Sequence, residues 1–179
     1  MTSLLTITRL DHVKQQVQGE RQVRSHTDTS VMPNTAVDQR TGDRYRAIAL
    51  ELYPRLAAGV PEAFHVVDEQ VRVFVDDDAS VTQGIAQWQQ HWQHWREAFD
   101  GLTVQVNRSL QDGHRVALAY TISGRHTGAF VHSDRTEHEA SAAEVSVDVI
   151  DFLEFGEQGT ITEVVSVFNP DDIVAQITS

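Results

Sequence analysis

Apolar and polar residues alternate along the second half of the chain, where a helical period gives way to a strand-like period after Gly101. A period of two is typical of strands that bury one face. Four stretches show it: LTVQVNRSL, RVALAYTISGRH, AEVSVDVIDFLEF and TITEVVSVFN. The connections QDGH and GEQGT contain turn residues that favour hairpins between antiparallel neighbours. We therefore predict a mostly antiparallel sheet.

Apolar residues between Ile48 and Val60 recur at the period of a helix. They fall at steps of four, as Ile48, Leu52, Leu56 and Val60. The segment EAFHVVDEQVRVFV predicts a short helix that leads into a strand, and DDDASVTQG predicts an exposed loop. Ser80 or Thr82 is expected to cap the next helix. Helices followed by a run of strands indicate an α+β domain whose helices pack on the concave face of a curved sheet.

The next predicted helix, IAQWQQHWQHWREAF, carries an aromatic stripe. Its large apolar residues are spaced three or four apart and share one face: Ile85, Trp88, Trp92, Trp95 and Phe99. Such a face packs in a core or walls a cavity, and we name Trp88 and Trp92 as candidate substrate-binding residues. His91 and His94 have a spacing compatible with two metal ligands on a helix. No obvious third ligand is nearby, so no metal site is expected.

The first 40 residues differ from the rest of the chain. Ile7, Leu10, Val13 and Val17 have the spacing of a short amphipathic helix, whereas SHTDTSVMPNTAVDQRTGD is polar and rich in turn residues. We therefore divide the chain into an N-terminal extension over residues 1–40, with a candidate short helix and an irregular part, and a single α+β domain over residues 41–179.

Composition narrows the class of protein. The chain has 179 residues and a net charge of −12, which argues against nucleic acid and against anionic membrane surfaces as partners. No apolar run approaches the roughly 20 residues that cross a bilayer, and the first residues lack the layout of a secretory signal. The chain has no cysteine, which excludes disulfides and thiolate chemistry. These observations predict a cytoplasmic protein.

Four segments together resemble a known family. REAFDGLTVQV, QDGHRVALAY, GRHTGAF and GTITEVVSVFNPDDIVAQI follow one another as in the SnoaL-like polyketide cyclases of the nuclear transport factor 2-like superfamily. The similarity covers roughly residues 45–178. It implies a cone-shaped α+β barrel with a deep pocket between the concave sheet face and the covering helices. It also implies a homodimer or homotetramer that uses no metal and no organic cofactor.

The alternation of side chains between the two faces of each strand locates a candidate site in this pocket. Tyr120 and His126 share a face with apolar neighbours on one strand, and Asp151 is the only polar residue on the apolar face of the next. A face of the last strand carries Glu163, Val165 and Asn169. Apolar surfaces interrupted by a few convergent polar groups are typical of small-molecule sites. Our candidate catalytic residues are His126, Asp151 and Asn169, and Tyr120, Glu163 and Val165 join the two tryptophans as candidate substrate-binding residues.

Each candidate catalytic residue has more than one interpretation. His126 is suited to acid–base chemistry near neutral pH, or is a structural histidine. Burial would raise the pKa of Asp151 and make it a proton shuttle, or the carboxylate anchors the backbone or an arginine. Asn169 stands where the resemblance implies the aspartate base of the aldol cyclases. Because an amide cannot take a proton from carbon, aldol ring closure is not expected.

We predict a cofactor-free cyclase or isomerase of secondary metabolism, as in polyketide or antibiotic biosynthesis. It would close or rearrange a ring in an apolar, oxygenated substrate, with the pocket folding the substrate and Asp151 or His126 transferring protons. One alternative is water addition, as in the epoxide hydrolases of the superfamily, with Asp151 and Asn169 holding a water. The other is a non-catalytic ligand-binding module.

Overall fold

The computed structural model describes residues 35–75, 78–132 and 134–179. The candidate helix in residues 7–17 lies outside the described residues, as does most of the predicted extension over residues 1–40. The first described element, helix α2 (Thr35–Ala57), begins before residue 41, the predicted start of the main domain.

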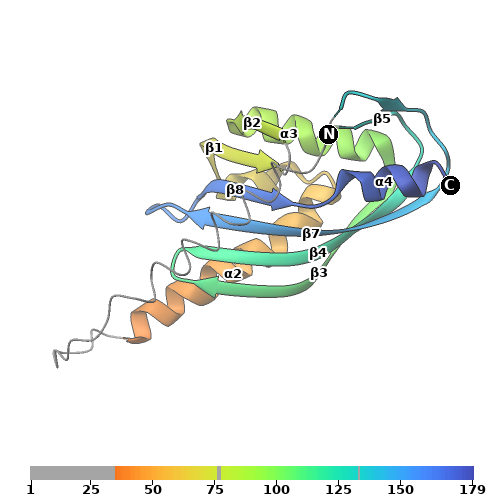
Figure 1. Ribbon diagram of the computed structural model, residues 1–179. Helices are drawn as coiled ribbons and strands as arrows, with labels where there is room; N and C mark the ends of the chain where they lie inside the picture. The colour runs from red at the N-terminus through yellow and green to blue at the C-terminus, as the bar shows by residue number, and fades with distance from the viewer. Residues whose placement is uncertain (1–34, 76–77, 133) are drawn as a thin grey trace, which may run out of the picture. The chain divides into compact units, whose positions relative to one another are not determined.

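Helices pack against one large curved sheet in the described part of the chain (Figure 1). The elements after α2 are η1 (Pro61–Val66), β1 (Val67–Val75), β2 (Asp78–Gln83), α3 (Ile85–Ala98), β3 (Phe99–Asp112), β4 (Arg115–His126), β5 (Phe130–Val131), β6 (Glu137–His138), β7 (Glu144–Phe155), β8 (Ile161–Val167) and α4 (Pro170–Ile177). Within the described residues the large sheet has six strands, in the order β2-β1-β8-β7-β4-β3. Its β1–β8 pair is parallel and its other pairs are antiparallel. The predicted α+β class with a mostly antiparallel sheet is confirmed.

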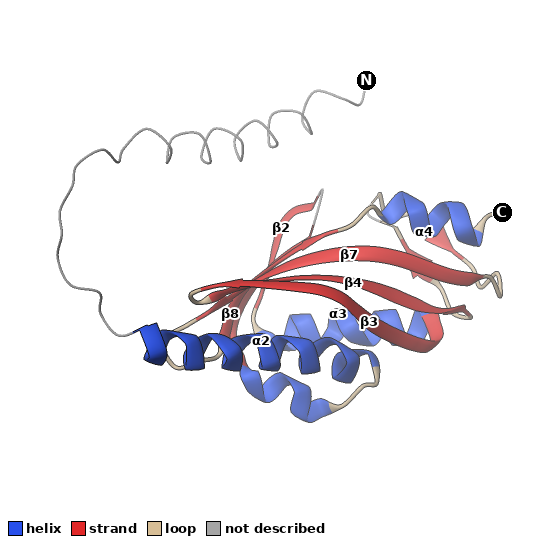
Figure 2. Cartoon of the chain, turned by 90° about the horizontal axis from the view of Figure 1, so that it is seen from below, coloured by secondary structure: helices blue, strands red, loops and turns tan. Residues whose placement is uncertain are grey.

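The sheet turns one apolar face toward α2 and α3. Along β7 every second residue from Val145 to Phe155 is buried, and β4 alternates in the same way from Val116 to Ile122. Figure 2 shows α2 and α3 along the same side of the curved strands. The core of the domain is therefore the layer between these helices and the inner face of the sheet, as expected for a cone-shaped α+β barrel.

The buried stripe of α2 combines steps of three and four residues. Its buried members include Tyr45, Ala49, Leu52, Tyr53 and Leu56. The predicted stripe at strict steps of four is wrong at Val60, which lies beyond the helix, whereas Ile48 is half-buried and packs against the core. Strict steps of four drift around a helix of 3.6 residues per turn, so the prediction missed Tyr53. Neither α2 nor any other described helix has the length and apolar character needed to span a membrane.

The predicted loop before α3 contains an edge strand. Strand β2 pairs antiparallel with β1 and covers the edge of β1 that β8 leaves free. This pairing satisfies backbone groups that a loop would leave to solvent. The residue at the N-cap of α3 is Gly84, with φ of 95°, and no side chain caps the helix. The prediction that Ser80 or Thr82 caps α3 is therefore wrong.

Helix α4 extends the sheet past the end of β8. The side-chain amide of Gln176 binds the backbone of Ser146 twice, accepting from its N–H at 2.9 Å and donating to its carbonyl at 3.0 Å. These are the backbone groups of β7 that have no partner once β8 has ended. Ile173 and Ile177 of α4 are buried against the same region. The C-terminal helix thus covers an otherwise open strand edge.

Gly128, in the segment GRHTGAF, allows the chain to pass close to the end of α3. The backbone N–H groups of Thr127 and Gly128 both donate to the carbonyl of Ala98, at 2.9 and 3.1 Å. A Cβ atom at position 128 would lie 2.1 Å from the carbonyl oxygen of Glu97. No side chain fits at this distance, so the crossing requires glycine.

We expect Gly128→Ala to lower the free energy of unfolding by more than about 2 kcal/mol, because the new methyl group must displace backbone. Urea denaturation measures the change. Gly101→Ala is the matched control: Gly101 has φ of +63°, but a methyl group added there would meet no heavy atom within 4 Å, so only conformational strain of roughly 1 kcal/mol applies. Equal losses in the two variants would contradict the steric explanation.

Candidate active site

A small cavity lies between α3 and the inner face of the sheet. It measures about 20 Å³, which is room for one water molecule. Its walls are mostly aromatic and aliphatic side chains, including all three tryptophans of α3. Other polar side chains that reach it are Tyr53, His91, Tyr120, Asp151 and Ser166. Four of the predicted site residues therefore line one cavity: Trp88, Trp92, Tyr120 and Asp151.

Two tyrosines hold Asp151 within this apolar layer. Asp151 is 2% exposed, and its Oδ2 accepts hydrogen bonds from the hydroxyls of Tyr53 on α2 and Tyr120 on β4, the latter at 3.1 Å. The centroids of the two tyrosine rings lie 4.7 Å apart. An ionised carboxylate is costly to bury without partners, so these two hydroxyls determine where the carboxylate can lie.

Burial changes the acidity of Asp151 and of the two tyrosines that bind it. Burial raises the pKa of Asp151 from 3.8 to about 6, while the hydroxyls of Tyr53, Ser166 and Tyr120 oppose the rise. Burial, with the nearby charge of Asp151, raises the pKa values of both tyrosines well above 10.0. At neutral pH Asp151 is therefore mostly ionised but readily takes up a proton, whereas both phenols keep theirs. This state suits a general base.

Two buried polar atoms of the cavity have no partner in the described chain. Asp151 Oδ1 accepts no hydrogen bond. Ser166 faces Asp151 across the β7–β8 pair, close enough for its hydroxyl to lower the pKa of Asp151, but it forms no hydrogen bond with Oδ1. The indole N–H of Trp92 is also buried and unpartnered. Asp151 and Trp92, which both line the cavity, therefore carry a free acceptor and a free donor, as is found where a ligand completes the hydrogen bonding.

His91 is a neutral member of the cavity wall. Burial, with a smaller effect of His94, lowers the pKa of His91 to about 4. Its Nε2 accepts from the indole N–H of Trp95 at 3.1 Å, so the neutral ring carries its proton on Nδ1. Among the described residues, no three His, Asp or Glu side chains form a group that could hold a metal ion.

His126 lies on the predicted face of β4 but does not line the cavity. It follows Tyr120 by six residues, which at about 3.4 Å per residue separates the two by roughly 20 Å along the strand. The side chain is fully buried against Phe99, with ring centroids 5.4 Å apart. Its Nδ1 accepts from the backbone N–H of Ser141 at 3.2 Å, and burial lowers the pKa of His126. Its Nε2 has no partner in the described structure.

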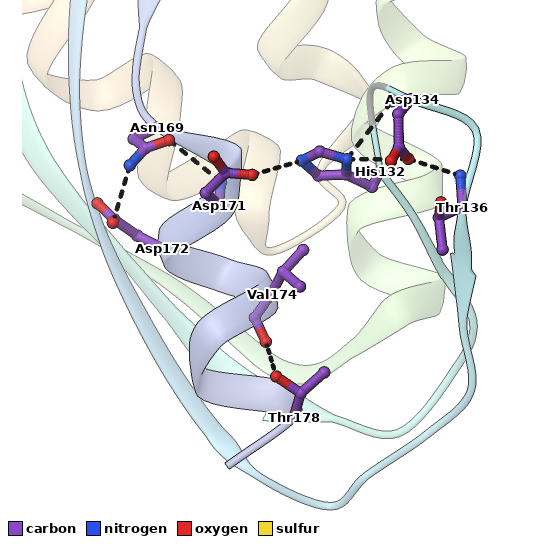
Figure 3. A network of polar contacts seen from close by, with 8 residues as sticks. All are labelled: His132, Asp134, Thr136, Asn169, Asp171, Asp172, Val174 and Thr178. Atoms are coloured by element: carbon purple, nitrogen blue, oxygen red, sulfur yellow. Dashed lines mark hydrogen bonds and ion pairs between the residues drawn. The ribbon is translucent and has the colours of Figure 1, made fainter. Parts of the chain in front are cut away.

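Asn169 caps α4 and does not line the cavity either. Its Oδ1 accepts from the backbone N–H of Asp171 at 3.2 Å, and its Nδ2 donates to Asp172 Oδ1 at 2.9 Å (Figure 3). Asn169 is thus the N-cap residue of α4, a position that favours asparagine. Both ends of the amide are used within the helix terminus. The structure does not bring Asn169 together with Asp151 or His126.

His132 joins the β5–β6 hairpin to the start of α4. Its Nδ1 lies 3.0 Å from Asp134 Oδ1 and its Nε2 lies 3.1 Å from Asp171 Oδ1 (Figure 3). Aromatic contacts reinforce this connection, since Phe130 of β5 and Phe168 both pack on Trp95, with centroids 6.4 and 6.1 Å apart. Phe168 and Trp95 also line the cavity. Trp95 and Phe168 therefore form one side of the cavity, which we call its rim, and the hairpin packs against this pair through Phe130.

Glu163 and Val165 lie on the outer face of the sheet. Glu163 forms an ion pair with Arg72 of β1, and Val165 stands opposite Phe152, which is 52% exposed. The inner face of β8 instead carries Val164 and Ser166. This corrects the predicted face of β8 by one residue. Valines at both 164 and 165 give the strand no clear alternation, so parity alone could not assign its faces.

Three polar residues of the cavity, Tyr53, His91 and Ser166, are not predicted as site residues from the sequence. A stripe at mixed steps of three and four would have found Tyr53, which is four residues from Ala49. The spacing of His91 suggested only a metal ligand, although Trp88 and Trp95 lie three residues before it and four after it on the same helix face. Ser166 gave no signal of its own, because its orientation follows from pairing with Asp151.

The family of the chain follows from its sequence. Residues 51–177 match the family described as SnoaL-like polyketide cyclase, and the chain belongs to this family. The predicted resemblance is therefore confirmed. A comparison with curated proteins gave no match.

Solved structures share the fold at low sequence identity. A candidate SnoaL-like polyketide cyclase from Jannaschia sp. CCS1 has a TM-score of 0.68 and 15% identity, covering 85% of this chain and 99% of its own. AclR, a candidate hydroxylase from Streptomyces galilaeus, has a TM-score of 0.65 and 18% identity, covering 76% and 96%. IdmH, a candidate polyketide cyclase from Streptomyces antibioticus, has a TM-score of 0.62 and 17% identity, covering 76% and 99%. At these identities the likeness concerns the fold.

We expect Asp151→Asn to change how stability depends on pH. The pKa of Asp151 is 3.8 unfolded and about 6 folded, so the folded wild type holds more protons between these values and loses stability as pH rises through 6. Asparagine does not ionise. The free energy of unfolding of Asp151→Asn minus that of the wild type should therefore grow by about 3 kcal/mol from pH 3 to pH 8.

Urea denaturation across this pH range measures the difference between the two proteins. Asp148→Asn is the matched control, because Asp148 lies on the exposed face of the same strand. The effect of burial on this carboxyl group would be contradicted in two cases. In the first, the difference in free energy of unfolding between Asp151→Asn and the wild type does not vary with pH. In the second, it varies with pH as much as the difference for Asp148→Asn does.

Proposed function

We propose that the protein is a cofactor-free cyclase or isomerase of secondary metabolism in which Asp151 transfers protons on an apolar, oxygenated substrate. One observation supports this most strongly. Asp151 is 2% exposed, its pKa is raised to about 6, and its Oδ1 is unpartnered at a cavity. Perturbed carboxyl groups in apolar cavities are candidates for acid–base catalysis. Membership of the SnoaL-like polyketide cyclase family supports a polyketide-like substrate.

In the proposed reaction, Asp151 Oδ1 accepts a proton from a substrate carbon next to a carbonyl group. The C–H bond breaks, an O–H bond forms on Oδ1, and the electron pair moves onto the substrate as an enolate. In an isomerisation, Asp151 returns the proton to another carbon. In a conjugate addition, the enolate carbon attacks an electrophilic carbon of the same molecule and Asp151 returns the proton afterwards. Both reactions balance without an oxidant or a reductant.

The two tyrosines define which oxygen of Asp151 reacts. Both donate to Oδ2, so the carboxylate cannot rotate without breaking two hydrogen bonds. Oδ1 therefore stays the oxygen without a donor and is the one available to a substrate. Fixed donors of this kind act without reorganisation during the reaction. We assign His126 a structural role in this proposal, because its Nδ1 binds the backbone of Ser141 outside the cavity.

The cavity must widen to admit a ring. At about 20 Å³ it is much smaller than the roughly 150 Å³ cavity that binds benzene in a protein core. The rim residues Phe168 and Trp95 pack on each other and would have to separate. Rim opening is a common step in enzymes that exclude water during the reaction.

The size of the closed cavity favours one second candidate. Space for one water, beside the free acceptor Asp151 Oδ1 and the free donor Trp92 N–H, is what the addition of an activated water would require. The reaction would then be hydrolysis of an epoxide. Oxygen from labelled solvent would enter the product in hydrolysis, whereas intramolecular ring closure would leave the product unlabelled.

We expect Asp151→Asn to reduce kcat/KM at least 100-fold, because general-base catalysis contributes about 10²- to 10⁴-fold. A test set of β,γ-unsaturated cyclic ketones, with 3-cyclohexenone as the smallest, reports conversion to the conjugated ketone by ultraviolet absorbance. Asp148→Asn should keep the wild-type rate. Asp151→Asn turning over at the wild-type rate would refute the assignment, and binding of the ketones without conversion by the wild type would favour a non-catalytic binding module.

The pH profile tests the role of the tyrosines. Because the base must be ionised, kcat/KM should rise with pH to a plateau with a midpoint near 6, the pKa of Asp151. The hydroxyls of Tyr53 and Tyr120 lower this pKa, so Tyr53→Phe and Tyr120→Phe should each move the midpoint to higher pH. Tyr45→Phe is the control, since Tyr45 is buried against Phe155. A midpoint that stays in place in both cavity variants would argue against Asp151 as the titrating group.

A further inference from the structure

The three tryptophans of α3 differ in what their indole N–H groups contact. The N–H of Trp95 donates to His91. The N–H of Trp92 is buried and has no partner in the described chain. All three rings line the same cavity. A buried unpartnered donor costs roughly 1 to 3 kcal/mol, so the N–H of Trp92 requires an explanation that the packing of its ring does not give.

We propose that the indole N–H of Trp92 binds the carbonyl oxygen of the substrate, next to the carbon from which Asp151 removes a proton. This inference rests on the proposed function. Trp92 and Asp151 both line the cavity, and their unpartnered atoms, an N–H donor and a carboxylate acceptor, are the two kinds of group that an enolising ketone needs at its oxygen and at its acidic C–H. As negative charge develops on that oxygen, a fixed N–H donor in a dry site stabilises it.

The other donors of the cavity are less suited to this role. The hydroxyls of Tyr53 and Tyr120 are bound to Asp151 Oδ2. His91 is only half-buried as a residue, and its Nε2 already accepts from the N–H of Trp95. The N–H of Trp92, in contrast, is sealed from solvent. The substrate class that follows is an apolar ketone, or its enol, whose oxygen enters the cavity first.

Phenol and toluene provide a matched pair of probes. They have nearly the same size and need the same opening of the rim, but only phenol has an enol-like oxygen. The chain has three tryptophans, so nitrogen-15 NMR spectra show three indole N–H signals, which Trp88→Phe and Trp92→Phe assign. Phenol should move the Trp92 signal downfield and toluene should not. The wild type should bind phenol more tightly than toluene, and Trp92→Phe should reduce this preference about fivefold.

Trp88→Phe is the control, because it removes an indole from the same helix face and should keep the preference for phenol. The proposal is overturned if the Trp92 signal does not respond to phenol, or if the two variants lose the preference equally. These outcomes do not decide the proposed function, which is tested by the turnover rate of Asp151→Asn. A phenol preference that depends on Trp92, found in a protein without catalytic activity, would support the oxygen site and refute the enzyme.

Discussion

The hydrogen bonding of Asp151 is the constraint on which the interior of this domain depends. A carboxylate in an apolar layer needs donors, and these come from two different elements, Tyr53 on α2 and Tyr120 on β4. The carboxylate itself belongs to β7, so one oxygen atom connects a helix and two strands. The position of α2 on the sheet is therefore fixed by a polar contact as well as by apolar packing. Sliding the helix by one turn would leave the carboxylate without its donor from α2.

The same contact leaves part of the site unsatisfied. Two tyrosines serve one oxygen of Asp151 while the other oxygen has none, and the N–H of Trp92 is unpartnered across the same cavity. An optimally stable core would pair these atoms or replace them with apolar groups. Departures of this kind occur where a protein binds or reacts, because a ligand supplies the missing partners. The raised pKa of Asp151 has the same origin, since burial without full solvation disfavours its charge.

How much the sequence predicts depends on how clear its periodicity is. Strand β7 alternates without interruption, so its buried face and the position of Asp151 on it were predictable. In β8, adjacent valines hide the alternation, and its inner face became clear only from pairing with β7. His126 shows a different limit. The alternation of side chains predicts on which face of a strand a residue lies, but not how far along the strand the cavity reaches. Strand β4 is long enough for one face to extend beyond the cavity. The position of Tyr53 at the cavity is known only from the way α2 packs against the sheet.

Polar side chains near the start of α4 have structural contacts. Asn169 uses its amide to cap α4, and His132 lies between two aspartates that tie the β5–β6 hairpin to that helix. The position at which the resemblance implies an aldol base is thus occupied by a residue with a structural task. The unpartnered atoms of the residues that line the cavity belong to Asp151 on β7 and Trp92 on α3. Among the described carboxyl groups, burial raises the pKa of Asp151, so the proposed proton transfer is placed at this residue and not at the start of α4.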